Sequence, residues 1–158
     1  MKRNTVEMAK RIKARVSLDR AADHLDKVSD GTALLLKSHL LVEEALYAAI
    51  QTKCLHPEFI LDANLGFAQL LTVAKALFFK EDEAALWNAI QALNWMRNRL
   101  AHDLEPPDMG SAFEGLTFGK WHPEKNALLN DPDTMIAVSM SIGMILGSIS
   151  KLLPTAGP

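Results

Sequence analysis

Apolar positions recur along this chain at steps of three and four residues, which is the period of an amphipathic α-helix. The pattern predicts helices over residues 32–55, 65–79, 84–101 and 134–150. Asp62 or Asn64 is a candidate N-cap for the second of these helices. The acidic residues 81–83 suit the start of the third helix, because negative charge stabilises a helix N-terminus. The second and third helices are expected to be antiparallel neighbours.

Two segments near the C-terminus depart from ordinary amphipathic patterning. Residues 103–133 are polar and contain Pro and Gly, so they predict a long loop before the last helix, of a kind that can serve as a lid. Residues 134–150 carry no charge, but they are short for a membrane span and lack basic or aromatic anchors. We therefore expect no membrane contact. Ser139, Gly143 and Gly147 predict the close approach of another helix, in the core or across a dimer interface.

Length and composition agree with the helical pattern. The chain has 158 residues and is 49% hydrophobic, which suits one domain with a substantial core. Leu and Ala are abundant and runs of β-branched residues are scarce, so we predict an all-α fold. Residues 1–29 are assigned to a basic N-terminal helical segment, residues 30–153 to a helical bundle, and residues 154–158 to a tail.

The net charge of −2 hides an uneven distribution. Residues 1–20 hold seven Lys or Arg against two acids, and Lys10, Arg11 and Lys13 are candidates for contact with nucleic acid. A solvated amphipathic helix explains the same residues. The rest of the chain is acidic and repels a polyanion outside any cleft. The single cysteine, Cys54, fits a reducing compartment, and with no targeting peptide in view we expect a cytoplasmic protein.

An arginine interrupts the apolar stripe of residues 84–101. The stripe runs through Leu86, Ile90, Leu93, Arg97 and Leu100. A guanidinium keeps its charge in a protein, so Arg97 has to be paired, hydrogen-bonded or open to a polar cleft.

The first predicted helix contains a matching interruption by a carboxylate. Its stripe runs through Leu36, Leu40, Glu43, Tyr47 and Ile50. We expect Glu43 to face Arg97 across the bundle in a fork-to-carboxylate contact. An ion pair that only fixes the helix register is the structural alternative.

Further polar residues follow Arg97 on the same helix. Asn98 and His102 are four residues apart and share a helix face, so the amide can hydrogen-bond the imidazole and set its tautomer. Arg97 and His102 are separated by an angle of about 140° and a rise of about 7.5 Å on a straight helix. A helix that ends or bends near Ala101, or a second copy of the chain, is needed to bring them together. Arg99 and Asp103 look like an exposed pair, and Arg99 is a further candidate for nucleic-acid contact.

The residues "RNRLAH" (97–102) resemble the R-N-x-x-x-H motif of the HEPN superfamily, the higher eukaryotes and prokaryotes nucleotide-binding domains. The long helix with "HLLVEEAL", the second helix pair and the motif at the end of the following helix resemble the HEPN bundle over residues 30–150. The resemblance implies an antiparallel bundle of about five helices.

Many HEPN members are metal-independent ribonucleases whose motifs line one cleft in a dimer. The resemblance implies that Arg97 stabilises phosphate charge and that His102 transfers a proton or orients the RNA 2′-hydroxyl, with Asn98 in support. Glu43 is the expected acidic partner, and Glu44 replaces it if the helix phase differs by one residue. The implied protein is a homodimeric toxin or defence component that cuts RNA without a metal or cofactor. An antitoxin or a regulatory protein is the expected partner.

Two other functions remain open. The segment "GFAQLLTVAKALFF" followed by "ALNWMRNRLAH" also resembles the mannitol operon repressor-like branch, whose members are regulators. In such a non-catalytic module, Arg97 and Glu43 hold the bundle together. A metal-dependent enzyme that uses His39 and Glu43 at helical spacing is less favoured, because no third ligand stands out.

Overall fold

The computed structural model describes residues 17–103, 108–121 and 129–154, and these residues form α-helices and no strand. The all-α prediction is therefore confirmed for this part of the chain. The predicted contacts Lys10, Arg11 and Lys13 lie outside the described residues. The elements are α2 (Leu18–Leu25), α3 (Gly31–Gln51), α4 (Pro57–Asp62), α5 (Phe67–Phe78), the 3-10 turn η1 (Glu81–Glu83), α6 (Ala84–His102), α7 (Gly110–Leu116) and α8 (Pro132–Ser150).

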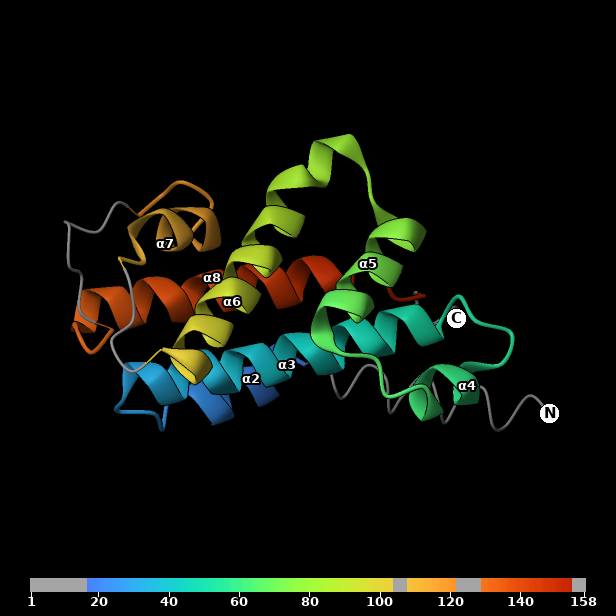
Figure 1. The fold of residues 1–158 in the computed structure, drawn as a ribbon, viewed down its shortest axis with the longest axis horizontal. Coiled ribbons are helices and arrows are strands. Elements are labelled where there is room, and N and C mark those ends of the chain that lie inside the picture. The colour runs from blue at the N-terminus through green and yellow to red at the C-terminus, as the bar shows by residue number, and fades with distance from the viewer. Residues whose placement is uncertain (1–16, 104–107, 122–128, 155–158) are drawn as a thin grey trace.

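The central helix is α3, which packs against α2, α5, α6 and α8 (Figure 1). Its N-cap is Asp30, whose carboxylate accepts a hydrogen bond from the backbone N–H of Ala33 at 2.8 Å. Much of the helix circumference is apolar, so several helical stripes fit the sequence. The predicted stripe was wrong in its first half, because Leu36 and Leu40 are 40% and 59% exposed. The fully buried positions of this helix include Leu35, Val42, Ala45 and Leu46.

Helices α3 and α8 lie side by side and run in the same direction (Figure 1). Their first turns are joined by a hydrogen bond of 2.7 Å from the backbone N–H of Gly31 to Oδ1 of Asn130. A Cβ atom at position 31 would lie 2.0 Å from the carbonyl oxygen of Leu129, so only glycine fits this approach. The predicted antiparallel arrangement does not hold for this central pair of helices.

Helices α5 and α6 form an antiparallel pair connected through η1, as expected (Figure 1). The predicted N-cap of α5 was wrong, because Asp62 ends α4 and Asn64 lies in the turn that follows it. The N-cap is Gly66, whose backbone N–H donates a 3.0 Å hydrogen bond to Oε1 of Gln69. This bond caps the first turn of α5.

The long loop predicted over residues 103–133 contains a packed helix. Helix α7 lies against α6, and its Phe113 and Leu116 are 1% and 0% exposed. Burial of these two side chains makes α7 part of the core, so the prediction of a loop without a helix was wrong.

Helix α8 is long and apolar enough to cross a membrane by length and composition alone. One side of it is buried in the core, including Val138, Ile142 and Ile145. Gly143 and Gly147 have open space where a Cβ would stand, so no helix of this chain approaches them within the described residues. The predicted close contact across a dimer stays a prediction.

Candidate functional site

An open pocket of about 500 Å³ lies between α3, the N-terminal end of α5 and α6. It receives polar side chains from all three helices. Its lining consists of His39, Glu43, Gly66, Phe67, Ala68, Gln69, Asn94, Arg97 and Asn98.

Arg97 is half-buried at the edge of the apolar face of α6. The core position next to it is taken by Met96, which is fully buried. The guanidinium Nη1 donates a hydrogen bond to Oδ1 of Asn98 at 3.1 Å. The core stripe therefore continues through Met96, and Arg97, which the sequence placed in that stripe, lies beside it and lines the pocket.

Glu43 shares the pocket with Arg97, but their charged atoms lie more than 4.0 Å apart. The Glu43 side chain is 27% exposed, and burial raises the pKa of its carboxyl, while the positive charge of Arg97 opposes that shift. Glu44 takes a different direction and forms an ion pair with Arg20 of α2. Of the two candidate acidic partners, Glu43 is the one that faces Arg97, without the direct fork-to-carboxylate contact that was expected.

His39 forms the inner wall of the pocket and is 6% exposed. Its Nε2 lies 3.3 Å from Oδ1 of Asn94, and its Nδ1 lies 3.9 Å from Oε2 of Glu43. The imidazole also packs on the Phe67 ring, with 4.1 Å between ring centroids. Burial lowers the pKa of His39, and the charge of Arg97 lowers it further against the opposing effect of the Asn94 hydrogen bond, so the neutral imidazole is favoured.

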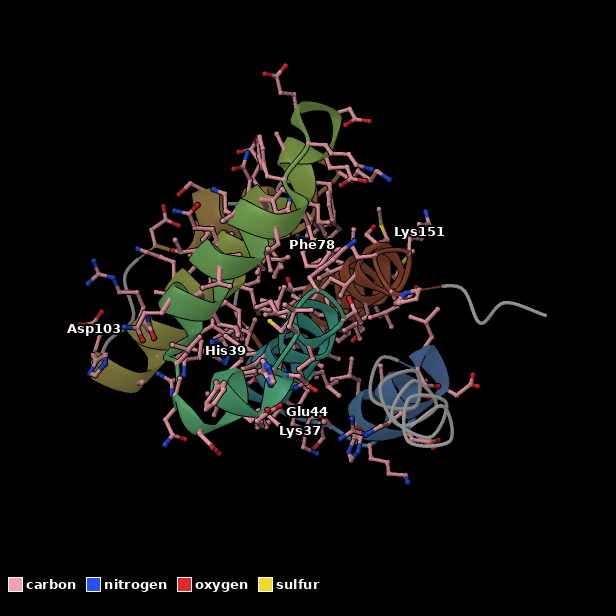
Figure 2. All side chains as sticks on the ribbon, turned by 90° about the vertical axis from the view of Figure 1, so that its right-hand side faces the viewer. Lys37, His39, Glu44, Phe78, Asp103 and Lys151 are labelled. Atoms are coloured by element: carbon pink, nitrogen blue, oxygen red, sulfur yellow. The ribbon has the colours of Figure 1, made fainter. Side chains whose placement is uncertain are left out.

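His102 lies apart from this pocket at the exposed end of α6. Helix α6 ends at His102, one residue beyond Ala101 as expected, but it stays helical from Arg97 to His102. On this unbroken helix Arg97 and His102 point about 140° apart. Asp103, the next residue, lies at the edge of the molecule in Figure 2, whereas His39 lies further in. Within one chain, the structure brings Arg97 together with Glu43 and His39, and not with His102.

The other predicted polar contacts on α6 are local. Asn98 accepts its hydrogen bond from Arg97 and not from His102. Arg99 is exposed and pairs with Asp103 at 3.2 Å, while its guanidinium lies 5.3 Å from the centroid of the Trp95 ring. The Arg99–Asp103 pair was predicted correctly. The predicted contact of Arg99 with nucleic acid stays a prediction.

From the sequence, His39 was paired with Glu43 only as a possible metal ligand, and Asn94 was not singled out. A signal was present, because Asn94, Arg97 and Asn98 recur at steps of three and four residues and define one polar edge of α6. His39 and Glu43 are likewise one helical turn apart on α3. The contribution of Phe67 had no such signal, because it depends on where the start of α5 meets α3.

The chain matches no protein-family model, and comparison with curated proteins and with solved structures gave no significant match. The HEPN resemblance therefore stays a prediction. The pocket offers one guanidinium, one carboxylate, a neutral imidazole and several amides on three helices. Such a set can bind an anion through Arg97 and exchange a proton close to it.

Proposed function

We propose that the protein is a metal-independent endoribonuclease of HEPN type, acting as a cytoplasmic toxin or defence component. The observation that carries the proposal is the setting of Arg97. Its guanidinium lines an open pocket and is more than 4.0 Å from the nearest carboxylate there, Glu43. An arginine whose only task was to lock two helices would be expected in a direct, enclosed ion pair.

The chemistry of the pocket suits cleavage of a phosphodiester. Arg97 presents a planar donor group to a phosphate, and the side-chain amides of Asn94 and Asn98 add hydrogen-bond donors beside it. RNA supplies its own nucleophile in the 2′-hydroxyl, so no metal-bound water is needed. The expected products are a 2′,3′-cyclic phosphate and a 5′-hydroxyl.

A second copy of the chain is the proposed source of His102 for this cleft. Leu36 and Leu40 are exposed and lie on the same stripe of α3 as Glu43, so apolar surface borders the pocket. A homodimer that covers these leucines removes them from water. It also allows His102 of one chain to meet Arg97 of the other, which the unbroken α6 does not allow within one chain.

The test is cleavage of a single-stranded RNA oligonucleotide with EDTA present. Wild type is compared with Arg97→Ala, with His102→Ala and with Lys80→Ala, a matched loss of an exposed cation outside the pocket. We expect Arg97→Ala and His102→Ala to abolish cleavage and Lys80→Ala to retain it. An equimolar mixture of the two inactive variants should recover part of the activity, because a mixed dimer contains one complete cleft.

RNA cleavage that is unchanged in both Arg97→Ala and His102→Ala would overturn the proposal. A wild-type protein that leaves all RNA intact would overturn it as well and would favour a binding or regulatory module. Circular dichroism of each variant establishes that a loss of activity does not reflect unfolding.

A further inference from the structure

The titratable groups that the structure places in the pocket with Arg97 are Glu43 and His39. Glu43 is half-buried with 27% of its side chain exposed, so a bound molecule can reach its carboxylate. His39 is nearly enclosed, with both ring nitrogens directed at protein groups. Glu43 can therefore contact a ligand directly, whereas His39 can act only through the protein groups next to it.

The contacts of His39 fix which of its nitrogens carries the hydrogen. The Oδ1 atom of Asn94 can only accept a hydrogen bond, so Nε2 of His39 is the donor across their 3.3 Å contact. A neutral imidazole then has a lone pair on Nδ1, the atom that lies 3.9 Å from Oε2 of Glu43. Stacking on Phe67 keeps the ring in this orientation. The 3.9 Å separation is longer than a hydrogen bond, so this lone pair accepts the carboxyl hydrogen only when a protonated Glu43 moves closer.

From this arrangement we infer that Glu43 is a catalytic residue that accepts the 2′-hydroxyl proton of RNA, and that His39 is a positioning residue that receives the resulting carboxyl hydrogen bond. The inference rests on the proposed function and adds to it a proton acceptor outside the "RNRLAH" motif. As the 2′-oxygen forms its bond to phosphorus, its proton moves to Glu43. The bond from phosphorus to the 5′-oxygen breaks, and the 5′-oxygen takes a proton from His102 of the second copy. Glu43 then returns its proton to solvent, and His102 takes one up.

The charges around Glu43 suit this role. Arg97 faces it from α6, where it can hold the phosphodiester, and α5 adds only uncharged groups to the lining. On α3 itself the neighbours are His39 and Glu44, whose charge is paired with Arg20 of α2. Burial raises the pKa of the Glu43 carboxyl against the effect of Arg97, and the resulting carboxylate is a stronger base than one in water.

The test is the pH dependence of cleavage of the RNA oligonucleotide in wild type, Glu43→Gln and two His39 variants. Glu43→Gln keeps the size of the side chain but cannot accept the proton, so kcat should fall by roughly 100-fold or more. The acidic limb of the pH profile should also disappear. Glu58→Gln, which removes an exposed carboxylate on α4 outside the pocket, is the matched control and should keep both kcat and the limb.

The two His39 variants separate positioning from a general loss of structure. The side-chain amide of His39→Asn replaces the Nδ1 side of the ring toward Glu43, whereas that of His39→Gln replaces the Nε2 side toward Asn94. We expect His39→Asn to retain activity and His39→Gln to lose it by up to about 100-fold, with its acidic limb displaced. Thermal unfolding of both variants shows whether each is folded.

Each result bears on a distinct part of the reasoning. If Arg97→Ala loses cleavage while Glu43→Gln keeps the wild-type kcat and pH profile, the inference is wrong and the proposed function stands. If the two His39 variants are equally active, the positioning role is wrong. If wild type does not cleave RNA at all, both the proposed function and this inference fall.

Discussion

Replacing Arg97 with alanine tests whether this side chain borders an open pocket or forms a structural ion pair between helices. Breaking a buried ion pair costs about 3–5 kcal/mol, because the remaining charge is stranded. Here the charged atoms of Arg97 and Glu43 are more than 4.0 Å apart, and both side chains border an open pocket. Two charges 4 Å apart in water attract by about 1 kcal/mol. We therefore expect Arg97→Ala to lower the free energy of unfolding by no more than about 1 kcal/mol.

A double-mutant cycle isolates the attraction between the two side chains. The free energies of unfolding of wild type, Arg97→Ala, Glu43→Gln and the double variant are measured by urea denaturation followed by circular dichroism. The coupling energy between the two positions should be below about 1 kcal/mol and should shrink with added salt, because the pocket admits solvent.

Two substitutions on the same helix calibrate the measurement. Leu93 is fully buried, so Leu93→Ala should cost about 2–5 kcal/mol. Arg99→Ala removes an exposed pair and should change stability by about 0.5 kcal/mol or less. A coupling energy near 3 kcal/mol between Arg97 and Glu43 would refute the reasoning. It would make the pair a structural lock and would remove the main support for an anion-binding pocket.

Three further predictions concern the fold and its pH dependence. Gly31→Ala should destabilise the protein by about 1–3 kcal/mol, because the added Cβ overlaps with Leu129. Gly143→Ala should stabilise it by up to about 1 kcal/mol, because its Cβ enters open space. The midpoints of urea denaturation compare the two variants. Phe113→Ala should cost about 3–5 kcal/mol by the same assay, and a change near zero would mean that α7 is a mobile lid. Burial lowers the pKa of His39 from 6.5, so the stability that it contributes is present above that pH and is lost as the pH falls. As the pH falls from about 7.5 to about 5.5, wild type should therefore lose more stability than His39→Gln. Equal losses in the two proteins would contradict this expected effect of His39.

The helical pattern was enough to predict the main helices but not which side of each helix is buried. Periodicity placed helices close to α3, α5, α6 and α8, because each has a continuous apolar face. On α3 the phase was ambiguous, since apolar residues occupy most of its circumference, and Leu36 and Leu40 were wrongly assigned to the core. Helix α7 was missed because only two of its side chains, Phe113 and Leu116, are buried, too few to give a periodic signal.

The candidate site was predictable where a charge broke an apolar stripe. Arg97 and Glu43 were singled out as charges among apolar residues, and they line one pocket, although the core stripes run beside them through Met96 and Val42. For His39 the sequence offered only its one-turn spacing from Glu43, which does not distinguish a pocket residue from a histidine of the core. Its contacts with Phe67 and Asn94 join three helices that are distant in sequence, and spacing along one helix cannot show them.

The two consecutive glutamates of α3 show how one helix can serve the fold and the pocket at once. Neighbouring residues on a helix point about 100° apart, so Glu43 and Glu44 face different partners. Glu44 is neutralised by Arg20 of α2, which joins α2 to α3. Glu43 then remains with Arg97 in the open pocket, where neither charge is held by the other. The ion pair that joins α3 to another helix is thus made by Glu44, and Arg97 keeps its hydrogen bond to Asn98 at the pocket.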